Sequence, residues 1–157
     1  MPPPARQECQ YAACYCEENV YKMCERLTDE EEAVVVFVSN DGRSVPLWRQ
    51  AKGRSEEDGF ILWDYHVFLL LRRSEDAGSG YWAVFDLDTT LPFPTDFAVY
   101  FEEAIRDDDR FQERFRRKFR VIPSADYLKL FTSDRSHMIK DGEWLAAPPQ
   151  WPKETIH

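Results

Sequence analysis

Apolar residues recur at helical spacing near the start of the chain. Within residues 17–27, apolar side chains stand at Val20 and again three, four and seven positions later, which is the pattern of an amphipathic helix. Cys16 lies one turn before Val20 on the same stripe, so the pattern places it at the helix start. Glu17 and Glu18 in the first turn suit the positive end of the helix dipole.

Short apolar runs predict strands along the middle of the chain. The run AVVVFV at 33–38 reads as a buried strand, and a second strand is expected at 44–48. Pro46 lies within that second strand and places it at a sheet edge, because proline cannot donate to the ladder. The ranges 60–71 and 81–88 predict a hairpin. Both are apolar on both faces, so the sheet should be covered on both sides.

Two further helical segments, near 96–105 and 124–131, would cover this sheet together with the first helix. The pattern therefore predicts one α/β domain around a mainly antiparallel sheet, either in two layers or in three as an α-β-α sandwich. The Pro-rich residues 1–8 predict a flexible tail before a domain that spans 9–157.

Composition narrows the class of protein. A chain of 157 residues with 43% hydrophobic and 15% aromatic residues is typical of one packed globular domain. The net charge of −9 argues against nucleic-acid binding, which needs basic surface. No apolar run is long enough for a membrane span, and the first residues lack the apolar core of a signal peptide. We therefore expect a cytoplasmic or nuclear protein with reduced cysteines.

The predicted hairpin brings a histidine and an acid together. Its loop centre falls near Asp76, and reflection about that point places His66 opposite Asp86. Directly opposed residues on one face have Cβ atoms about 5 Å apart. A carboxylate there would bind one imidazole nitrogen, fix the tautomer and leave the other nitrogen as a base. A slip of one residue would separate the two onto opposite faces.

Cys16 is the candidate nucleophile. At a helix N-terminus, the dipole and the backbone N–H groups favour a thiolate and would also stabilise an oxyanion. Cysteine, histidine and acid in this chain order are compatible with a thiol acyl-transfer enzyme. We therefore predict an enzyme that cleaves an amide through Cys16, His66 and Asp86. The structural alternative is a core cysteine and a strand histidine without catalytic roles.

The four cysteines could instead bind a metal. Cys9, Cys14, Cys16 and Cys24 are separated by four, one and seven residues. This spacing lacks the paired knuckles of structural zinc sites, and no second pair follows downstream. We therefore predict neither a metal site nor an organic cofactor.

The stretch Arg110–Arg120 combines six basic residues with phenylalanines at every fourth position. This spacing predicts an amphipathic helix with a solvated basic side. A patch that binds nucleic acid or an acidic peptide is the alternative.

Several longer motifs carry a resemblance to a known family. They are C-Y-C-E-E-N at 14–19, V-P-L-W at 45–48, W-D-Y-H-V at 63–67, D-L-D-T-T-L-P-F-P at 86–94, R-R-K-F-R-V at 116–121 and S-D-R-S-H-M at 133–138. With these motifs, the chain from about Cys9 to Pro152 resembles the protein N-terminal glutamine amidohydrolases.

The resemblance implies an activity. That family converts the N-terminal glutamine of proteins to glutamate and ammonia, and the new glutamate can be arginylated and read as a degradation signal. The same resemblance implies that Cys16 is the nucleophile, His66 the base and Asp86 the orienting acid. It also implies an α/β/α fold with a transglutaminase-like or papain-like core, and no cofactor. Family members usually continue beyond the position of His157, so we expect a shortened C-terminus.

Specificity for a first residue requires a site for the free α-ammonium group. Four acids are candidates: Glu18, Asp64, Asp88 and Asp134. Trp63 and Tyr65 are candidates for the pocket walls. The expected partners are proteins or peptides with a free N-terminal glutamine, and we expect a monomer that binds neither nucleic acid nor membranes. A transglutaminase-like acyl transferase and a non-catalytic module that binds N-termini remain alternatives.

Overall fold

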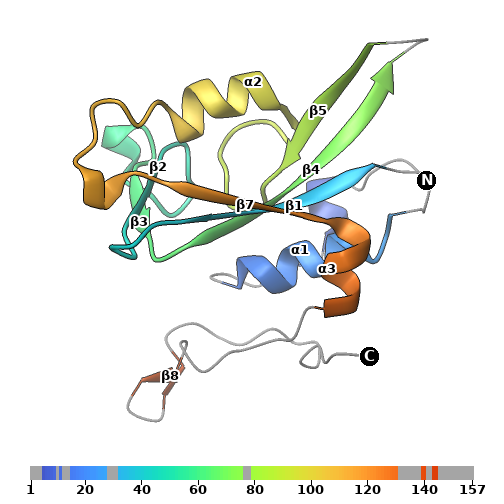
Figure 1. Cartoon of the computed structure of the whole chain (residues 1–157), viewed down its shortest axis with the longest axis horizontal. Coiled ribbons are helices and arrows are strands. Elements are labelled where there is room, and N and C mark those ends of the chain that lie inside the picture. The colour runs from blue at the N-terminus through green and yellow to red at the C-terminus, as the bar shows by residue number, and fades with distance from the viewer. Residues whose placement is uncertain are drawn as a thin grey trace.

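A five-stranded antiparallel sheet forms the centre of the fold (Figure 1). The computed structural model describes residues 5–9, 11, 15–27, 32–75, 79–130, 139–140 and 143–144. In spatial order the strands are β6 (Thr95–Asp96), β5 (Ser79–Phe85), β4 (His66–Glu75), β1 (Ala33–Ser39) and β7 (Lys118–Pro123). The described part of the chain is therefore a mixed α/β domain, as its hydrophobic pattern predicts.

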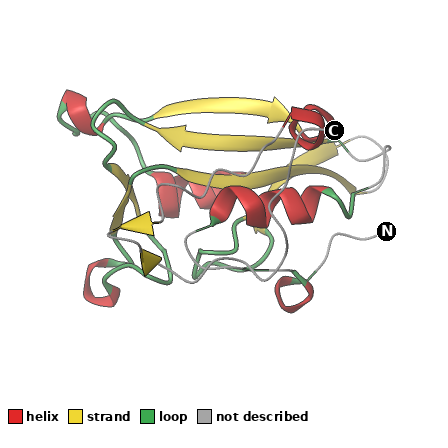
Figure 2. Cartoon of the chain, turned by 90° about the horizontal axis from the view of Figure 1, so that it is seen from below, coloured by secondary structure: helices red, strands yellow, loops and turns green. Residues whose placement is uncertain are grey.

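Helices lie on both faces of this sheet (Figure 1). Helices α1 (Cys16–Cys24) and α3 (Ser124–Leu130) contact each other on one face. Figure 2, which views the chain from below, shows helical segments in front of the strands of the sheet. On the other face, α2 (Phe97–Tyr100) continues into a π-helical turn, η3 (Phe101–Ile105). The first helix and the segment 96–105 thus form where the apolar spacing predicts them.

Smaller elements complete the described chain. Three are 3-10 turns: η1 (Arg6–Glu8), η2 (Ser55–Glu57) and η4 (Glu113–Phe115). Two are separate two-stranded sheets, β2 (Val45–Leu47) with β3 (Ile61–Trp63), and β8 (Ile139–Lys140) with β9 (Glu143–Trp144). Because β2 pairs only with β3, it has the edge position that its proline predicts. In the described chain no helix has the length and apolar character to cross a membrane.

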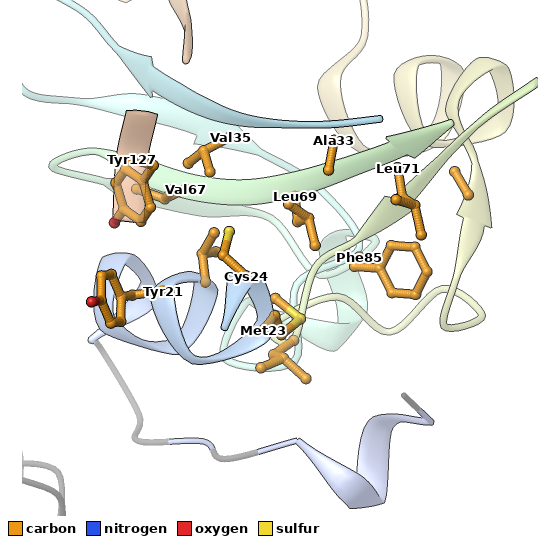
Figure 3. Packing of buried hydrophobic residues seen from close by; sticks show 13 residues of the cluster. Tyr21, Met23, Cys24, Ala33, Val35, Val67, Leu69, Leu71, Phe85 and Tyr127 are labelled. Carbon is orange, nitrogen blue, oxygen red and sulfur yellow. The ribbon is translucent and has the colours of Figure 1, made fainter. Parts of the chain in front are cut away.

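Two hydrophobic cores result, one on each face of the sheet. The first packs α1 and α3 against alternate residues of β1 and β4, including Val35, Val67 and Leu69 (Figure 3). The second packs Tyr100 and Ile105 against the side chains that point the other way. Since both cores are buried, the sheet fixes the orientation of α1, and therefore the position of Cys16 at its start.

The predicted strand at 60–71 is in fact two strands. The chain bends at Asp64 and Tyr65. The first half, β3, pairs with β2, while β4 begins at His66 within the main sheet. The apolar run alone did not reveal this bend, because each half is apolar in sequence but pairs with a different strand. The bend places His66 at the end of a strand rather than inside one.

The prediction of a helix at Arg110–Arg120 is wrong. The segment forms the 3-10 turn η4 and then enters β7, where Arg120 pairs with Phe37 of β1. The phenylalanine spacing suggested a helix, but β1 needs a partner strand on this side and the tertiary pairing prevails over local spacing. The side chain of Arg117, between η4 and β7, is buried.

Candidate active site

Cys16 is the first residue of α1, directly after the N-cap residue Tyr15. The residue as a whole is half-buried. Val20, one turn later, is buried in the core between α1 and the sheet. This packing directs the N-terminus of α1 toward the first residue of β4, which is His66.

His66 begins β4 and is fully buried, with 0% of its surface exposed. On one side it pairs with Val38 of β1. On the other side the ladder between β4 and β5 ends at the Leu69–Phe85 pair, so no β5 residue pairs with His66. This open edge gives the imidazole room to contact side chains from other elements. The indole of Trp63 stacks on the imidazole, with ring centroids 5.3 Å apart and an angle of 13° between planes.

Asp86 lies beside His66, as the sequence predicts, but through a different register. The observed pairs, such as Leu71 with Ala83, would place Asp88 rather than Asp86 directly opposite His66 if the ladder continued. The register differs from the prediction by two residues. A shift of two preserves the face, because side chains alternate with a period of two. Asp86 therefore approaches His66 diagonally, from the segment just after β5.

The contact between the two side chains is close. Nε2 of His66 is 3.0 Å from Oδ2 of Asp86, and both side chains are buried. The approach is bent, since neither imidazole nitrogen of His66 has a well-directed hydrogen bond within the described part of the chain. Hydrogen bonds of this kind often straighten only when substrate binds. The Asp86 contact uses Nε2 and leaves Nδ1 available to another group.

Three further groups hold Asp86. The hydroxyl of Tyr100 donates to Oδ2 at 2.6 Å, and the backbone N–H of Asp88 donates to Oδ1 at 2.9 Å. The amide of Gln50 lies 3.5 Å from Oδ2, and Gln50 also accepts from the indole N–H of Trp63 at 3.3 Å. Sequence reasoning missed Tyr100 and Gln50, because no local spacing connects them to Asp86.

Burial and charge together set the pKa values of this cluster. Burial raises the pKa of the Cys16 thiol, while the nearby His66 lowers it in part. Burial tends to lower the pKa of His66, but Asp86 and Cys16 together raise it well above 6.5. Burial tends to raise the pKa of Asp86, but His66 and Tyr100 hold it below 3.8. The cluster thus brings together a thiol, an imidazole and a carboxylate of the kind that can transfer one proton.

Two of the described candidate acids, Glu18 and Asp88, are buried, and Asp88 has 3% of its surface exposed. Asp88 lines a narrow gap, too small for a water molecule, together with Cys16 and Leu87. The hydroxyl of Tyr11 donates to its Oδ1 at 2.5 Å. Burial raises the pKa of Asp88, and the charge of His66 partly opposes this rise.

The structure separates the remaining candidates. Glu18 is buried within α1, and Asp64 is exposed and accepts from the backbone N–H of Tyr65 at 2.9 Å. The hydroxyl of Tyr65 donates to Oε1 of Glu17 at 2.5 Å. Asp64 and Tyr65 both line a groove of about 580 Å³. Asp134 lies outside the described residues.

One group of possible metal ligands occurs among the described residues. It consists of His66, Asp86 and Asp88, whose ligand atoms lie within 4.8 Å of one another. The group contains no cysteine, and Cys9, Cys16 and Cys24 are free thiols. Cys14 lies outside the described residues.

Comparison with known proteins points to one family. The chain matches the sequence profile of the family described as N-terminal glutamine amidase over residues 11–156. The protein N-terminal glutamine amidohydrolase of Drosophila ananassae is 49% identical over 155 residues, which cover 95% of this chain and 73% of that protein. The protein of the same name from Drosophila melanogaster is 49% identical over 159 residues, with the same coverage. That from Drosophila virilis is 48% identical over 155 residues.

Proposed function

We propose that this chain, which belongs to the N-terminal glutamine amidase family, converts the N-terminal glutamine of proteins and peptides to glutamate and ammonia. The observation that carries this proposal is the arrangement of three side chains. Cys16 at the start of α1 lies close enough to His66 for the two side chains to influence each other's charge, and Nε2 of His66 lies 3.0 Å from Asp86. Nucleophile, base and orienting acid are thus supplied by three separate segments of the chain.

The first half of the reaction forms a thioester. His66 takes the proton of Cys16 through Nδ1, and the thiolate attacks the side-chain amide carbon of glutamine. The first turn of α1 supplies backbone N–H groups and the positive end of the helix dipole to stabilise the oxyanion. Protonated His66 then gives its proton to the leaving nitrogen, and ammonia departs.

The second half of the reaction hydrolyses the thioester. Neutral His66 takes a proton from water, whose oxygen attacks the thioester carbon. The C–S bond breaks, and the proton returns from His66 to the sulfur of Cys16. Asp86 keeps its charge throughout, because its role is to orient the imidazole and stabilise the imidazolium. The order of cysteine, histidine and acid along the chain supports a likeness to transglutaminase-like and papain-like cores. The product of the reaction is a protein with an N-terminal glutamate, which can be arginylated.

We further propose that Asp88 binds the α-ammonium group of the substrate. Its carboxylate is buried beside a narrow gap that Cys16 also lines, and this gap must widen to admit the ammonium group. A substrate ammonium would offset the cost of that burial and share the carboxylate with Tyr11. Acetylation of the substrate N-terminus removes this charge and should lower kcat/KM by about 10²-fold or more, since a buried charge loses its partner. In the Asp88→Asn variant the ratio between free and acetylated peptides should fall toward one, and an unchanged ratio would exclude Asp88.

Ammonia release from short peptides tests the central proposal. The wild-type protein should release ammonia from a Gln-starting peptide and at least about tenfold more slowly from the Asn-starting peptide, whose side chain is one methylene shorter. Cys16→Ala and Cys16→Ser should both abolish the release while circular dichroism stays unchanged. Cys9→Ala is the matched control, because Cys9 is also a half-buried free thiol but lies outside the cluster. Turnover by the Cys16→Ala protein would refute the assignment.

A further inference from the structure

The groove of about 580 Å³ begins beside the catalytic cluster. Its lining includes Glu17, the residue after the nucleophile, and Tyr65, the residue before His66. The Tyr65 hydroxyl donates to Glu17 at 2.5 Å and joins these two parts of the lining. A substrate whose first side chain reaches Cys16 would therefore find this groove next to it.

The floor of the groove is the end of strand β1. Phe37 of β1 and Ile122 of β7 supply apolar surface there. The groove extends from the start of β4, across β1, to β7, because residues from all three segments line it. Neighbouring strands lie about 4.8 Å apart, so this crossing covers about 10 Å, which is the length of about three extended residues.

Charges of opposite sign line the two sides of the groove. Glu17 and Asp64 lie on the side of Cys16 and β4. Arg120 lies on β7, directly across from Phe37, and Arg43 follows the turn after β1. Both arginine side chains are exposed, and neither forms an ion pair with any described residue. Lys118, two residues before Arg120 on the same strand, differs because Asp41 pairs with it at 2.8 Å.

We infer that this groove binds the second to fourth residues of the substrate, and that Arg43 and Arg120 select acidic side chains at the third and fourth positions. The inference rests on the proposed function, because it takes the first residue to lie at Cys16. From there, three extended residues reach β7, where the two guanidinium groups have no acidic partner in the described structure. The acidic side of the groove would disfavour an acid at the second position.

Three hexapeptides test the charge preference. They begin with Gln-Ala and carry Asp-Asp, Asn-Asn or Lys-Lys at positions three and four. The kcat/KM for the Asp-Asp peptide should exceed that for the Asn-Asn peptide by about three- to tenfold at low salt, as expected for two exposed ion pairs. The Lys-Lys peptide should react more slowly than either. The preference for the Asp-Asp peptide should shrink in about 0.5 M salt, because screening is strong there.

Charge variants connect the preference to the two arginines. The double variant Arg43→Gln/Arg120→Gln should bring the Asp-Asp to Asn-Asn ratio close to one. Arg120→Glu should move the preference toward the Lys-Lys peptide. Arg110→Gln is the matched control, because Arg110 is also exposed but does not line the groove, and it should keep the wild-type ratio. An unchanged ratio in the double variant would overturn the inference.

Binding to the Cys16→Ala protein separates this inference from the proposed function. Fluorescence anisotropy of labelled peptides with a free N-terminus should show the same order of affinity, Asp-Asp before Asn-Asn before Lys-Lys. Equal affinities, or equal kcat/KM values for the three peptides, would exclude charge selection even if ammonia release is normal. Failure of every peptide to release ammonia, with the affinity order intact, would refute the proposed function and leave the groove assignment standing.

Discussion

Asp86 shows how much one buried carboxylate determines in this protein. It contacts His66, and its own oxygens are held by Tyr100, Gln50 and the backbone N–H of Asp88. His66 first, and then the Tyr100 hydroxyl and the Asp88 N–H, stabilise the charged form, so the pKa of Asp86 lies below 3.8 although burial opposes this. A fixed negative charge next to His66 is the main reason why the pKa of that imidazole is raised despite burial.

Replacing Asp86 by Asn should change both the rate and its pH dependence. The kcat should fall by about 10²- to 10⁴-fold, because the imidazole is no longer oriented for proton transfer. Without the carboxylate, burial lowers the pKa of His66, so the rising limb of kcat/KM against pH should move to lower pH. Ammonia release measured from about pH 5 to about pH 9 checks both the fall in kcat and the shift of the limb. A limb that stays in place or moves to higher pH would contradict this account, and the exposed Asp109→Asn variant should behave as wild type.

At the scale of elements, Arg117 joins segments that share no strand pairing. Its guanidinium donates to the carbonyl oxygens of Pro46 in β2, Ile105 at the end of η3, and Arg106. It also forms an ion pair with Asp108 at 2.7 Å. Only 7% of the residue is exposed. The side chain thus anchors the π-helical turn and β2 to the start of β7.

Arg117→Met should therefore destabilise the fold strongly. Methionine fills a similar volume but leaves the three carbonyl groups and Asp108 without their donor. Each buried acceptor that loses its donor costs about 1–3 kcal/mol, so the loss of several should total at least about 3 kcal/mol, while the half-exposed Asp108 adds less. Urea unfolding measures this loss directly. Arg110→Met, at an exposed site, should change the free energy of unfolding by less than about 0.5 kcal/mol, and equal effects of the two variants would show that Arg117 is not an anchor.

At the scale of the whole molecule, the His66–Asp86 pair couples folding to pH. The pKa of His66 is raised above 6.5, so its contribution to stability is complete below pH 6.5 and is lost as pH rises through the folded-state pKa. The pKa of Asp86 is lowered from 3.8, so its contribution is complete above pH 3.8 and is lost as pH falls through the folded-state pKa. Both contributions are complete between pH 3.8 and 6.5.

Comparison of unfolding at several pH values tests this coupling. The free energy of unfolding should be higher for the wild-type protein than for the Asp86→Asn variant. This difference should be largest at about pH 5, where both contributions are complete. The difference should shrink at about pH 9, because uncharged His66 gains less from the carboxylate. Urea titrations at the two pH values provide the measurement. A difference that grows with pH would mean that His66 is neutral in the folded protein across this range.

The sequence by itself determined the elements and the identity of the chemical groups. Spacing of three and four residues around Val20 placed Cys16 at a helix start, and the apolar runs located β1 and the hairpin of β4 and β5. These patterns are local, so they can be read without knowledge of the fold. The pairing of His66 with Asp86 was also predicted, since a register error of two residues leaves both on one face.

Only the tertiary structure decided the register, the bend at Asp64 and Tyr65, and the strand β7 in place of a helix. It also brought Tyr100 and Gln50 to Asp86 from positions 14 and 36 residues away. Contacts over such separations depend on how the sheet faces are covered, which no local period records. Residue periodicity therefore predicts which groups a strand or helix offers, while packing decides which of them meet.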